Sequence, residues 1–516
     1  MDMTDKEKRE HETRINEQIS KARESRTRFQ TRYNAYYDLT APTKKRVGND
    51  TSDPRPADDQ DDIFDATFEE VSENFAADML DEFTPSYRPW TKHEPVGGVA
   101  SVAMTKKIKE YITGRMEYLY DQIRQSSFEE AVQECYHDMA IGPAALMIRY
   151  SQSGPIDCEY VPLAELLILP GPRGGIGWRA WERYPLEKDL SVIWPDLDWP
   201  KILGKDPTQL RKSNSRIKIT ECFDRDYTND VEAWEYYLLV KGKIENAGYQ
   251  QGPGSCPLQV GRIRVSVPSA YGLGPASKAV PAARTLNRLA YLELKRLGKV
   301  VDPPGIFEDP DGIFNPDEGF EPGYMYQAGE GFKFHDMAPQ NDIREGFFKR
   351  EELEMAIRRA MFQDKPFQRG LTPPSATQWI DESTDREKRK ALPRARVHRE
   401  WVLPILRRFE WVLEMRGELE ELQIDGKAIK IEPVSPLSRA SDTQSAQVSI
   451  QALTAMAGVF PQFTMAVEMV ETAQNITSKL GDENIKFADG DQVQQMLMQA
   501  LTQGQGAGAP AGAPTQ

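Results

Sequence analysis

Few residues of this chain have types and spacings that could support enzyme chemistry. Gly272-Leu273-Gly274-Pro275-Ala276-Ser277 begins like a dinucleotide-binding fingerprint, but it lacks the third glycine, and Pro275 lies where the helix would start. The sequence has no GxxxxGKS or GxxxxGKT phosphate loop, so we expect the chain not to hydrolyse ATP itself. It also lacks the HExxH and GxSxG motifs of metalloproteases and serine hydrolases. We therefore expect no catalytic residues and no cofactor.

The side chains that could bind a metal ion are arranged no more favourably. His137-Asp138 and His335-Asp336 are adjacent pairs, and we expect both on solvated faces. An acidic cluster could hold a divalent ion, but it lacks the spaced ligands and the glycine of a calcium loop. Its members are Asp58, Asp59, Asp61 and Asp62. A solvated run of charge is the favoured interpretation, so we expect no metal site.

Composition limits which other classes of protein this chain can belong to. The 516 residues carry 65 basic and 80 acidic side chains, a net charge of −15, which disfavours a general DNA-coating surface but not the passage of DNA along an acidic wall. No apolar run approaches the length of a membrane span, and the N-terminus lacks the apolar region of a signal peptide, so we expect a cytosolic product and no membrane partner. The four cysteines lie far apart without a CxxC pair, which predicts buried free thiols: Cys135, Cys158, Cys222 and Cys256.

The region from Tyr271 to Gln363 gives the clearest architectural signal, because two helical patterns flank about forty residues that cannot be helical. In the first pattern Pro281 is expected in an opening turn, and apolar residues follow at spacings of three and four: Ala283, Leu286, Ala290, Leu294 and Leu297. The second pattern, Ile343 to Phe362, has a comparable stripe: Leu353, Ile357, Ala360 and Met361. Both helices therefore need apolar neighbours.

The segment between these helices is acidic and rich in proline and glycine. From Asp302 to Asp342 it has one basic residue, Lys333, so it should attract basic protein surfaces. Short strands are expected at Gly305 to Phe307 and Gly323 to Tyr326. A helix of about 24 residues would hold this segment about 36 Å from the body. An ordinary helical hairpin with a long loop remains the alternative.

The rest of the chain predicts an α+β fold, with helices on either side of a β-rich region. Helical patterns cover about Asp5 to Tyr37, Phe64 to Phe83, Val99 to Arg124 and Phe128 to Met139. Between Ala144 and Val267 the β-like runs are ALMIRY, CEYVPLAELLIL, RIKITECF, EAWEYYLLV and RIRVSV.

The C-terminal third begins with a proline-punctuated loop and a long helical pattern from about Ser375 to Arg416. Pro393 and Pro404 should kink or divide this helix, and Gly417 should end it. A hairpin is expected with Asp425-Gly426 at its turn. Further helices are expected at about 441–473 and 491–502, before a low-complexity tail that should be disordered.

Several segments, taken in order, resemble those of one family. They are FAADMLDEFTPSYRPW, AYGLGPASKAVPAARTLNRL followed by VVDPPG, LTPPSATQWIDES, LPILRRFEWVLEMRGEL and VSPLSRASDTQSAQ. Their collinear order resembles the podovirus-type phage portal proteins, also called head-to-tail connectors, over roughly residues 10 to 500. One departure is SATQW, where relatives tend to carry Thr-Ala-Thr-Glu, so a role tied to that glutamate is not carried over.

This resemblance implies a ring, usually of twelve chains, at one capsid vertex around a channel for double-stranded DNA. The implied partners are the terminase motor, a tail adaptor, and capsid and scaffolding proteins; the implied location is the virion, after assembly in the host cytoplasm. The implied map is 1–275 wing, 276–299 first stem helix, 300–340 clip, 341–363 second stem helix, 364–375 tunnel loop, 376–435 long kinked helix and wing hairpin, 436–500 helical crown and 501–516 disordered tail.

Three sets of candidate residues follow from this map. The stem would pack through Leu286, Ala290, Leu294, Leu297, Leu353, Ile357 and Met361. The clip would dock basic partner surfaces through Asp309, Asp311, Asp317, Glu318 and Glu321. The tunnel loop would contact DNA intermittently, without reading sequence, through Lys365, Phe367, Gln368 and Arg369. Lys365 and Arg369 could equally be solvated loop charges.

Besides an enzyme, the other alternative is a different structural phage assembly protein, such as a scaffold or a tail adaptor. A scaffold would be more uniformly helical and would lack the β-rich middle, while tail adaptors are usually much shorter. The portal interpretation is preferred because it explains an acidic segment held between two stem-like helices.

Overall fold

The computed structural model forms two compact units, residues 1–87 with 95–430, and residues 88–94 with 431–516. The residues described are 5–42, 44, 47, 62–87, 89–95, 106–172, 174–228, 230–266, 269–301, 305–308, 333–336, 344–363, 389–391, 393–420, 423–424, 427–433, 446, 448–455, 472–473 and 476–477. Helices combine with antiparallel sheets, which confirms the predicted α+β class.

The N-terminal helices match the sequence periodicity. They are α1 (Asp5–Thr40), α2 (Thr67–Phe83), α4 (Lys106–Gln125) and α5 (Phe128–Met139). The apolar residues that recur along α2 are buried, because this helix packs against α5: Phe68, Val71, Phe75, Met79 and Phe83.

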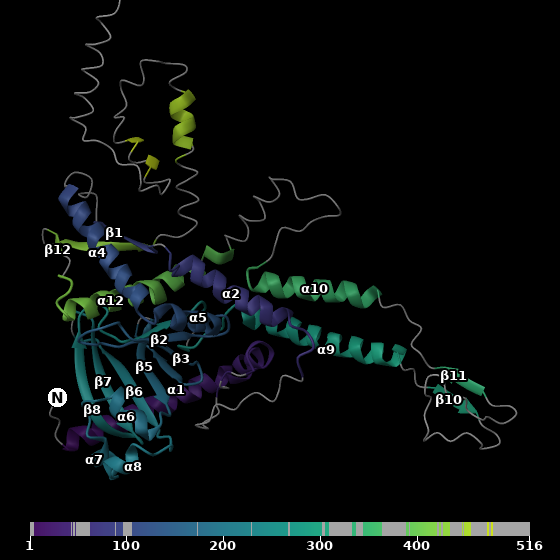
Figure 1. Cartoon of the computed structure of the whole chain (residues 1–516), viewed down its shortest axis with the longest axis horizontal. Coiled ribbons are helices and arrows are strands. Elements are labelled where there is room, and N and C mark those ends of the chain that lie inside the picture. The colour runs from purple at the N-terminus through teal and green to yellow at the C-terminus, as the bar shows by residue number, and fades with distance from the viewer. Residues whose placement is uncertain are drawn as a thin grey trace, which may run out of the picture. The chain divides into compact units, whose positions relative to one another are not determined.

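A five-stranded antiparallel sheet forms the largest layer of the first unit, in the order β4-β5-β6-β7-β8. Its strands are β4 (Leu166–Pro170), β5 (Ile176–Arg183), β6 (Ile219–Asp226), β7 (Ala233–Val240) and β8 (Lys243–Gln251). Helix α1 lies across one face, where Ile15, Ile19 and Ala22 share a buried cluster with Trp178 and Tyr237 (Figure 1). Short helices α6 (Leu190–Ile193), α7 (Trp199–Leu203) and α8 (Pro207–Leu210) connect β5 to β6.

A second sheet has the order β3-β2-β9, formed by β2 (Ala144–Ile148), β3 (Cys158–Val161) and β9 (Leu258–Gly261). The prediction of a strand at RIRVSV is wrong. The strand here is β9, which ends at Gly261, directly before this run. Arg262 instead turns inward and donates to the Ala270 carbonyl (2.9 Å) and to Glu400 (2.8 Å). Strands β5 and β8 were not predicted, since β5 buries charged residues and β8 is a polar edge strand.

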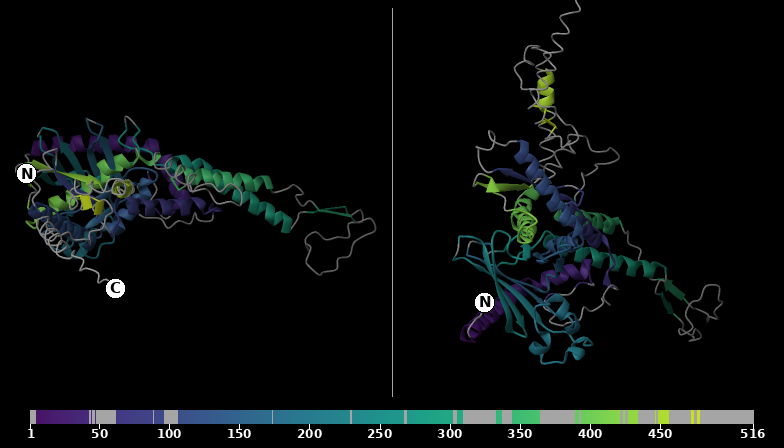
Figure 2. Two further views of the ribbon diagram at one scale, coloured as in Figure 1. Left: turned by 90° about the horizontal axis from the view of Figure 1, so that it is seen from above. Right: turned by 60° about the vertical axis from the view of Figure 1, so that its left-hand side comes forward.

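The two helices predicted around the acidic segment are α9 (Ala276–Val301) and α10 (Arg344–Ala360), which pack side by side (Figures 1 and 2). Pro281 is the sixth residue of α9 and not part of an opening turn, because the helix starts earlier than its apolar stripe. After α9, β10 (Gly305–Glu308) pairs antiparallel with β11 (Lys333–Asp336), which confirms the first predicted strand. The second, at 323–326, lies outside the described residues.

The predicted division of the long C-terminal helix is confirmed at Pro404. A π-helical turn, His398–Val402, precedes α12 (Leu403–Met415), whose second residue is this proline. Proline cannot donate the usual backbone hydrogen bond, which accounts for the change of helical pitch here. Gly417 follows α12 in the left-handed conformation (φ 72°), as predicted for its end.

Strands β12 (Gln423–Ile424) and β13 (Lys427–Pro433) pair antiparallel on either side of the predicted Asp425-Gly426 turn. The second unit contains most of β1 (Thr91–Pro95) and the end of β13, and the sheet order is β1-β13-β12. Helical residues are described at 448–455, within the predicted 441–473 helix. The predicted 491–502 helix and the tail lie outside the described residues.

The glycines of the Tyr271-Gly-Leu-Gly-Pro segment allow close backbone packing. The amide of Gly274 donates to the Ile141 carbonyl at 2.7 Å, and a Cβ at Gly274 would lie 2.0 Å from the Ala140 carbonyl oxygen. A Cβ at Gly272 would lie 1.7 Å from the Arg264 carbonyl oxygen. These contacts account for both glycines as packing residues at the start of α9.

Gly274→Ala should therefore destabilise the first unit by at least about 2 kcal/mol, because backbone atoms must move to admit the methyl group. Urea unfolding followed by tryptophan fluorescence measures the change. The matched control is Gly298→Ala within α9, where nothing lies within 4 Å of the added Cβ. This change should stabilise by up to about 1 kcal/mol. Equal stability of the two variants would contradict the packing role.

Candidate functional site

Helices α9 and α10 contain six of the seven stem-packing candidates, and Met361 directly follows α10; the seven lie in two different environments. Leu286, Ala290, Ile357 and Met361 are buried within the chain, and Leu353 is half-buried. Leu294 and Leu297 lie on the same stripe of α9, yet they are 54% and 56% exposed. The apolar stripe of α9 is therefore covered along its first half and open along its second.

Asn287 fixes the covered half of α9 to the chain segment that leads into α2. Its side-chain oxygen accepts hydrogen bonds from the backbone amides of Phe64 (2.7 Å) and Asp65 (3.1 Å). Its side-chain nitrogen donates to the Asp62 carbonyl at 2.8 Å. The ring of Phe64 also packs on Tyr291 with centroids 5.0 Å apart. One amide side chain therefore satisfies three backbone groups and fixes the position of α9.

Arg350 joins α9, α10 and the start of α2. Its guanidinium lies 2.8 Å from Asp65, 3.4 Å from Glu293 on α9 and 3.0 Å from Glu354 on α10. The hydrogen bond with Glu354 is the largest of the causes that raise the pKa of Arg350. The side chain of Asp65 is almost fully buried. Because three carboxylates share one cation, the two helices are fixed to each other and to the body.

The end of α10 is also attached to α2. Arg358 pairs with Glu70 at 3.2 Å, and the Gln363 side chain donates to the Val71 carbonyl at 3.0 Å. Between them, Phe362 has the left-handed φ of 62°, which is uncommon for a residue other than glycine. The base of the helix pair is therefore attached at several points, whereas Leu292, Leu294, Leu297 and Met355 remain exposed.

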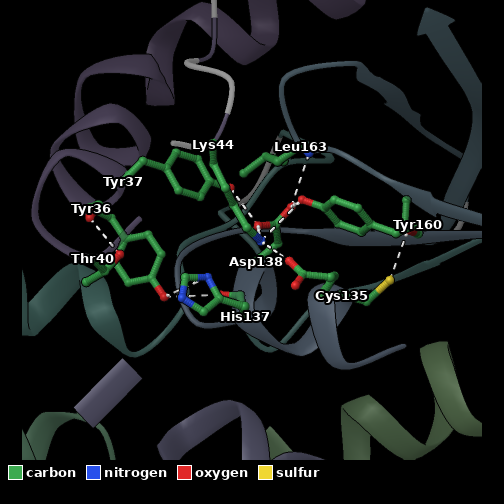
Figure 3. Close-up of polar contacts among 11 residues, drawn as sticks. Tyr36, Tyr37, Thr40, Lys44, Cys135, His137, Asp138, Tyr160 and Leu163 are labelled. Atoms are coloured by element: carbon green, nitrogen blue, oxygen red, sulfur yellow. Dashed lines mark hydrogen bonds and ion pairs between the residues drawn. The ribbon is translucent and has the colours of Figure 1, made fainter. Parts of the chain in front are cut away.

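A second polar arrangement overturns the expectation that His137-Asp138 is solvated. Asp138 is fully buried, and both of its carboxylate oxygens have two donors (Figure 3). Oδ1 accepts from Tyr37 (3.0 Å) and Lys44 (3.1 Å). Oδ2 accepts from Tyr160 (2.6 Å) and from the backbone amide of Leu163 (3.2 Å). Asp138 therefore joins α1, α5, β3 and the turn that leads into β4.

Lys44 neutralises the buried carboxylate from the segment that follows α1. Its ammonium also pairs with Glu134 at 2.8 Å and lies 5.0 Å from the centre of the Tyr160 ring. Burial alone would lower the pKa of Lys44, but Asp138 and Glu134 raise it above its usual value. Burial, followed by the charge of Asp138, raises the pKa values of Tyr37 and Tyr160. The cluster is therefore one lysine cation facing carboxylates, with neutral tyrosines, and has the character of a structural anchor.

The half-buried His137 and the buried His398 are both neutral near pH 7. Burial, together with Lys44, lowers the pKa of His137 to about 4. Burial, together with Arg394, lowers the pKa of His398 to about 4. The ring of His398 packs edge-on against Phe83 at 5.1 Å in the π-helical turn, and its ring nitrogens have no hydrogen-bond partner among the described residues.

Sequence reasoning missed this anchor, although a signal was present. Cys135 and Met139 lie on the buried face of α5, and Asp138 follows Cys135 by three residues on that same face. The four cysteines are free and buried, as predicted. Burial raises the pKa of each thiol, that of Cys158 to about 12. Across the described ranges, no group of three or more potential metal ligands comes together.

The tunnel-loop candidates Lys365, Phe367, Gln368 and Arg369 lie outside the described residues. The same holds for the clip candidates Asp309, Asp311, Asp317, Glu318 and Glu321, and for Asp58, Asp59 and Asp61 of the acidic cluster. His335 and Asp336 belong to β11, but their side chains are not described. Among the helices described, none combines the length and apolar character needed to cross a membrane.

Comparison with known proteins gives one family and several weak structural likenesses. The model of the family described as bacteriophage head to tail connecting protein matches residues 12–484. A structure titled "Virion of native gene transfer agent (GTA) particle" has 13% identity and a TM-score of 0.35, covering 75% of this chain and 84% of that one. "Neck of empty GTA particle computed with C6 symmetry" has 14% identity and a TM-score of 0.36, covering 77% and 90%. No curated protein matches the chain.

Asp138→Asn should destabilise the first unit by about 3 kcal/mol or more, because it leaves Lys44 facing a neutral amide in a buried site. The control is Glu134→Gln, which removes the other carboxylate partner of Lys44 at a half-exposed position. That change should cost less than about 1 kcal/mol. Urea unfolding of both variants at pH 7 measures the difference, and an equal loss would argue against Asp138 as the anchor.

The unfolding free energy should decrease as the pH falls from about 6.5 to about 4, and His398 should contribute to this loss. Its folded-state pKa is about 4, whereas an unfolded histidine has about 6.5, so the unfolded chain binds the proton first. The contribution is at most about 1.4 kcal/mol per pH unit. His398→Phe keeps a ring against Phe83 and should reduce the slope of unfolding free energy against pH. An unchanged slope would contradict this assignment.

Proposed function

We propose, from the premise that this chain belongs to the family of bacteriophage head-to-tail connecting proteins, that it forms the portal ring at one vertex of a phage capsid. The chain is thus a structural connector of the phage particle, and its proposed task is to conduct the genome during packaging and ejection. Twelve copies is the expected ring number, from the resemblance of its segments to podovirus-type portals.

One observation about the chain carries the ring proposal: the half-covered apolar stripe of α9. Leu286 and Ala290 are buried at the attached base, and Leu294 and Leu297 continue the same stripe into solvent. Full burial of a leucine side chain contributes about 1.5–3 kcal/mol. A neighbouring copy of the helix pair would cover these two leucines in every subunit, so the contact repeats around a closed ring.

The proposed map keeps residues 276–299 and 341–363 as stem and residues 300–340 as clip. The wing is 1–275, the tunnel loop 364–375, the kinked helix and hairpin 376–435 and the crown 436–500. The acidic clip would receive the basic surfaces of the terminase motor and later of the tail adaptor, through Asp309, Asp311, Asp317, Glu318 and Glu321.

The proposed mechanism is physical transport and not catalysis. Double-stranded DNA carries about one charge per 1.7 Å of axis, so a basic channel would bind it tightly and slow its passage. The net charge of −15 per chain favours a channel that does not bind DNA tightly. Lys365 and Arg369 of the tunnel loop would supply brief phosphate contacts without sequence readout, aided by Phe367 and Gln368. Assembly would occur in the host cytoplasm with capsid and scaffolding proteins, and the mature location would be the virion.

Replacing Leu294 and Leu297 together by aspartate should abolish ring assembly while leaving the monomer folded, because both side chains are already exposed within the chain. Mass photometry and negative-stain electron microscopy read the assembly, and circular dichroism reads the fold. Val192→Asp, at a position 81% exposed on α6, is the control and should leave assembly unchanged. Rings of normal size in the double variant would contradict the proposed stem contact.

A further inference from the structure

We propose that an arginine-lined cleft in the wing binds the acidic segment 48–63 of a neighbouring copy of the chain, an inference that rests on the proposed ring. The cleft has a volume of about 760 Å³. It lies between the start of β5, the end of β6, the residues just before β7, the strand β9, and the π-helical turn with the start of α12. Five arginines line it, Arg179, Arg225, Arg262, Arg399 and Arg407, with four carboxylates, Asp226, Asp230, Glu232 and Glu400.

The carboxylates of the cleft are largely engaged within the chain. Glu400 contacts Arg262 at 2.8 Å and Arg399 at 3.8 Å. Asp226 accepts hydrogen bonds from Thr228 and from Tyr249, and Glu232 accepts one from the Trp234 ring nitrogen at 2.9 Å. Asp230 is the exposed acidic residue at the rim.

The arginines retain more free binding capacity. Among the described residues, no carboxylate pairs with Arg179, Arg225 or Arg407. The guanidiniums of Arg179 and Arg225 stack on Trp234, at 4.6 and 5.9 Å from the ring centre. One edge of Arg179 is used within the chain, since its Nη1 donates to the Leu258 carbonyl, but its Nε has no hydrogen-bond partner among the described residues. Stacking holds the planar groups while leaving the remaining edge N–H donors available, which is the geometry that suits a carboxylate. The cleft therefore has a positive excess fixed in place by an aromatic ring.

The rim of the cleft favours a protein segment over nucleic acid. Tyr227 and Val231 line it and are 49% and 47% exposed, and aromatic residues with arginine are typical of protein interfaces. Asp230 at the rim would repel a phosphate backbone. A bound peptide could contact Tyr227 and Val231 through apolar groups while its carboxylates contact the arginines.

The sequence supplies a segment of matching charge. Residues 48–63 contain six aspartates and one arginine. The segment is fixed at both ends, since Val47 exchanges two hydrogen bonds with Asn34, at 2.8 and 3.0 Å, and the Asp62 carbonyl accepts from Asn287. The 14 residues 48–61 between these anchors have a maximum contour length of about 50 Å, so a loop fixed at both ends can extend about 25 Å from its anchors. In a ring, every copy would offer one segment and one cleft.

Fluorescence anisotropy with a labelled peptide of residues 48–63 tests the cleft directly. The protein is the full chain with Asp50, Asp53, Asp58, Asp59 and Asp61 changed to asparagine, so that its own segment does not compete. We expect binding that weakens at least about tenfold when Arg225→Glu and Arg407→Glu are added. Arg211→Glu, at an exposed arginine beside α8, is the control and should bind the peptide normally. Binding that is unchanged by the Arg225 and Arg407 substitutions would overturn the proposal.

Other occupants give different results in the same assay. Tighter binding of a peptide of residues 309–323 would overturn the choice of segment, and binding of a DNA duplex in place of either peptide would overturn the choice of a protein ligand. Peptide charge reversal provides a positive test: lysines at the positions of Asp58, Asp59 and Asp61 should restore binding to the Arg225→Glu, Arg407→Glu protein.

Disulfide crosslinking distinguishes a neighbouring copy from the same chain. The native cysteines are buried, so Asp59→Cys with Arg407→Cys adds the accessible thiols needed. Covalent ladders of two or more chains are expected, whereas a crosslink confined to single chains would overturn the assignment to a neighbour. Mass photometry of the wild-type protein reports the ring separately. Rings without peptide binding would reject only the cleft, and monomers under all conditions would reject the ring.

Discussion

The buried carboxylate of Asp138 is the interaction on which the first unit most depends. A charge in a fully buried site is tolerated only when it is neutralised and fully hydrogen-bonded, and here Lys44, two tyrosines and one backbone amide meet both requirements. These donors come from α1, the segment after it, β3 and the following turn. Asp138 lies on α5, and α5 packs against α2, to which the helices α9 and α10 are attached. The contacts of Asp138 therefore also support the position of this helix pair.

Side-chain contacts then fix the positions of α9 and α10 relative to α2. Asn287 and Arg350 connect the helix pair to the entry of α2, and Arg358 with Gln363 connects its end to α2. Beyond these contacts the leucines of α9 are open to solvent. The attached part of the helix pair is therefore held by contacts within the chain, whereas the exposed second half of the α9 stripe needs a second molecule to cover it. This division suits a subunit of a larger assembly.

Periodicity in the sequence predicted the helices well, since the apolar positions of α2 and α9 repeat at helical spacing. It could not indicate that Leu286 is buried within the chain while Leu294 is exposed, because that depends on how far the rest of the chain covers α9. Strand β5 was missed because its buried Glu182 and Arg183 look solvent-facing, although Arg23, Lys218 and Glu221 pair with them. Asp138 was misassigned for a similar reason, since Lys44 lies 94 residues earlier.

The placement of the four thiols has a consequence for following motions of this protein. All are buried and protonated, at positions on α5, β3 and β6 and just before β9, and α9 and α10 contain no cysteine. Only the thiolate reacts readily with alkylating reagents. The rate of alkylation of the native protein therefore reports how often the sheets of the body open, and it is insensitive to movements confined to the helix pair.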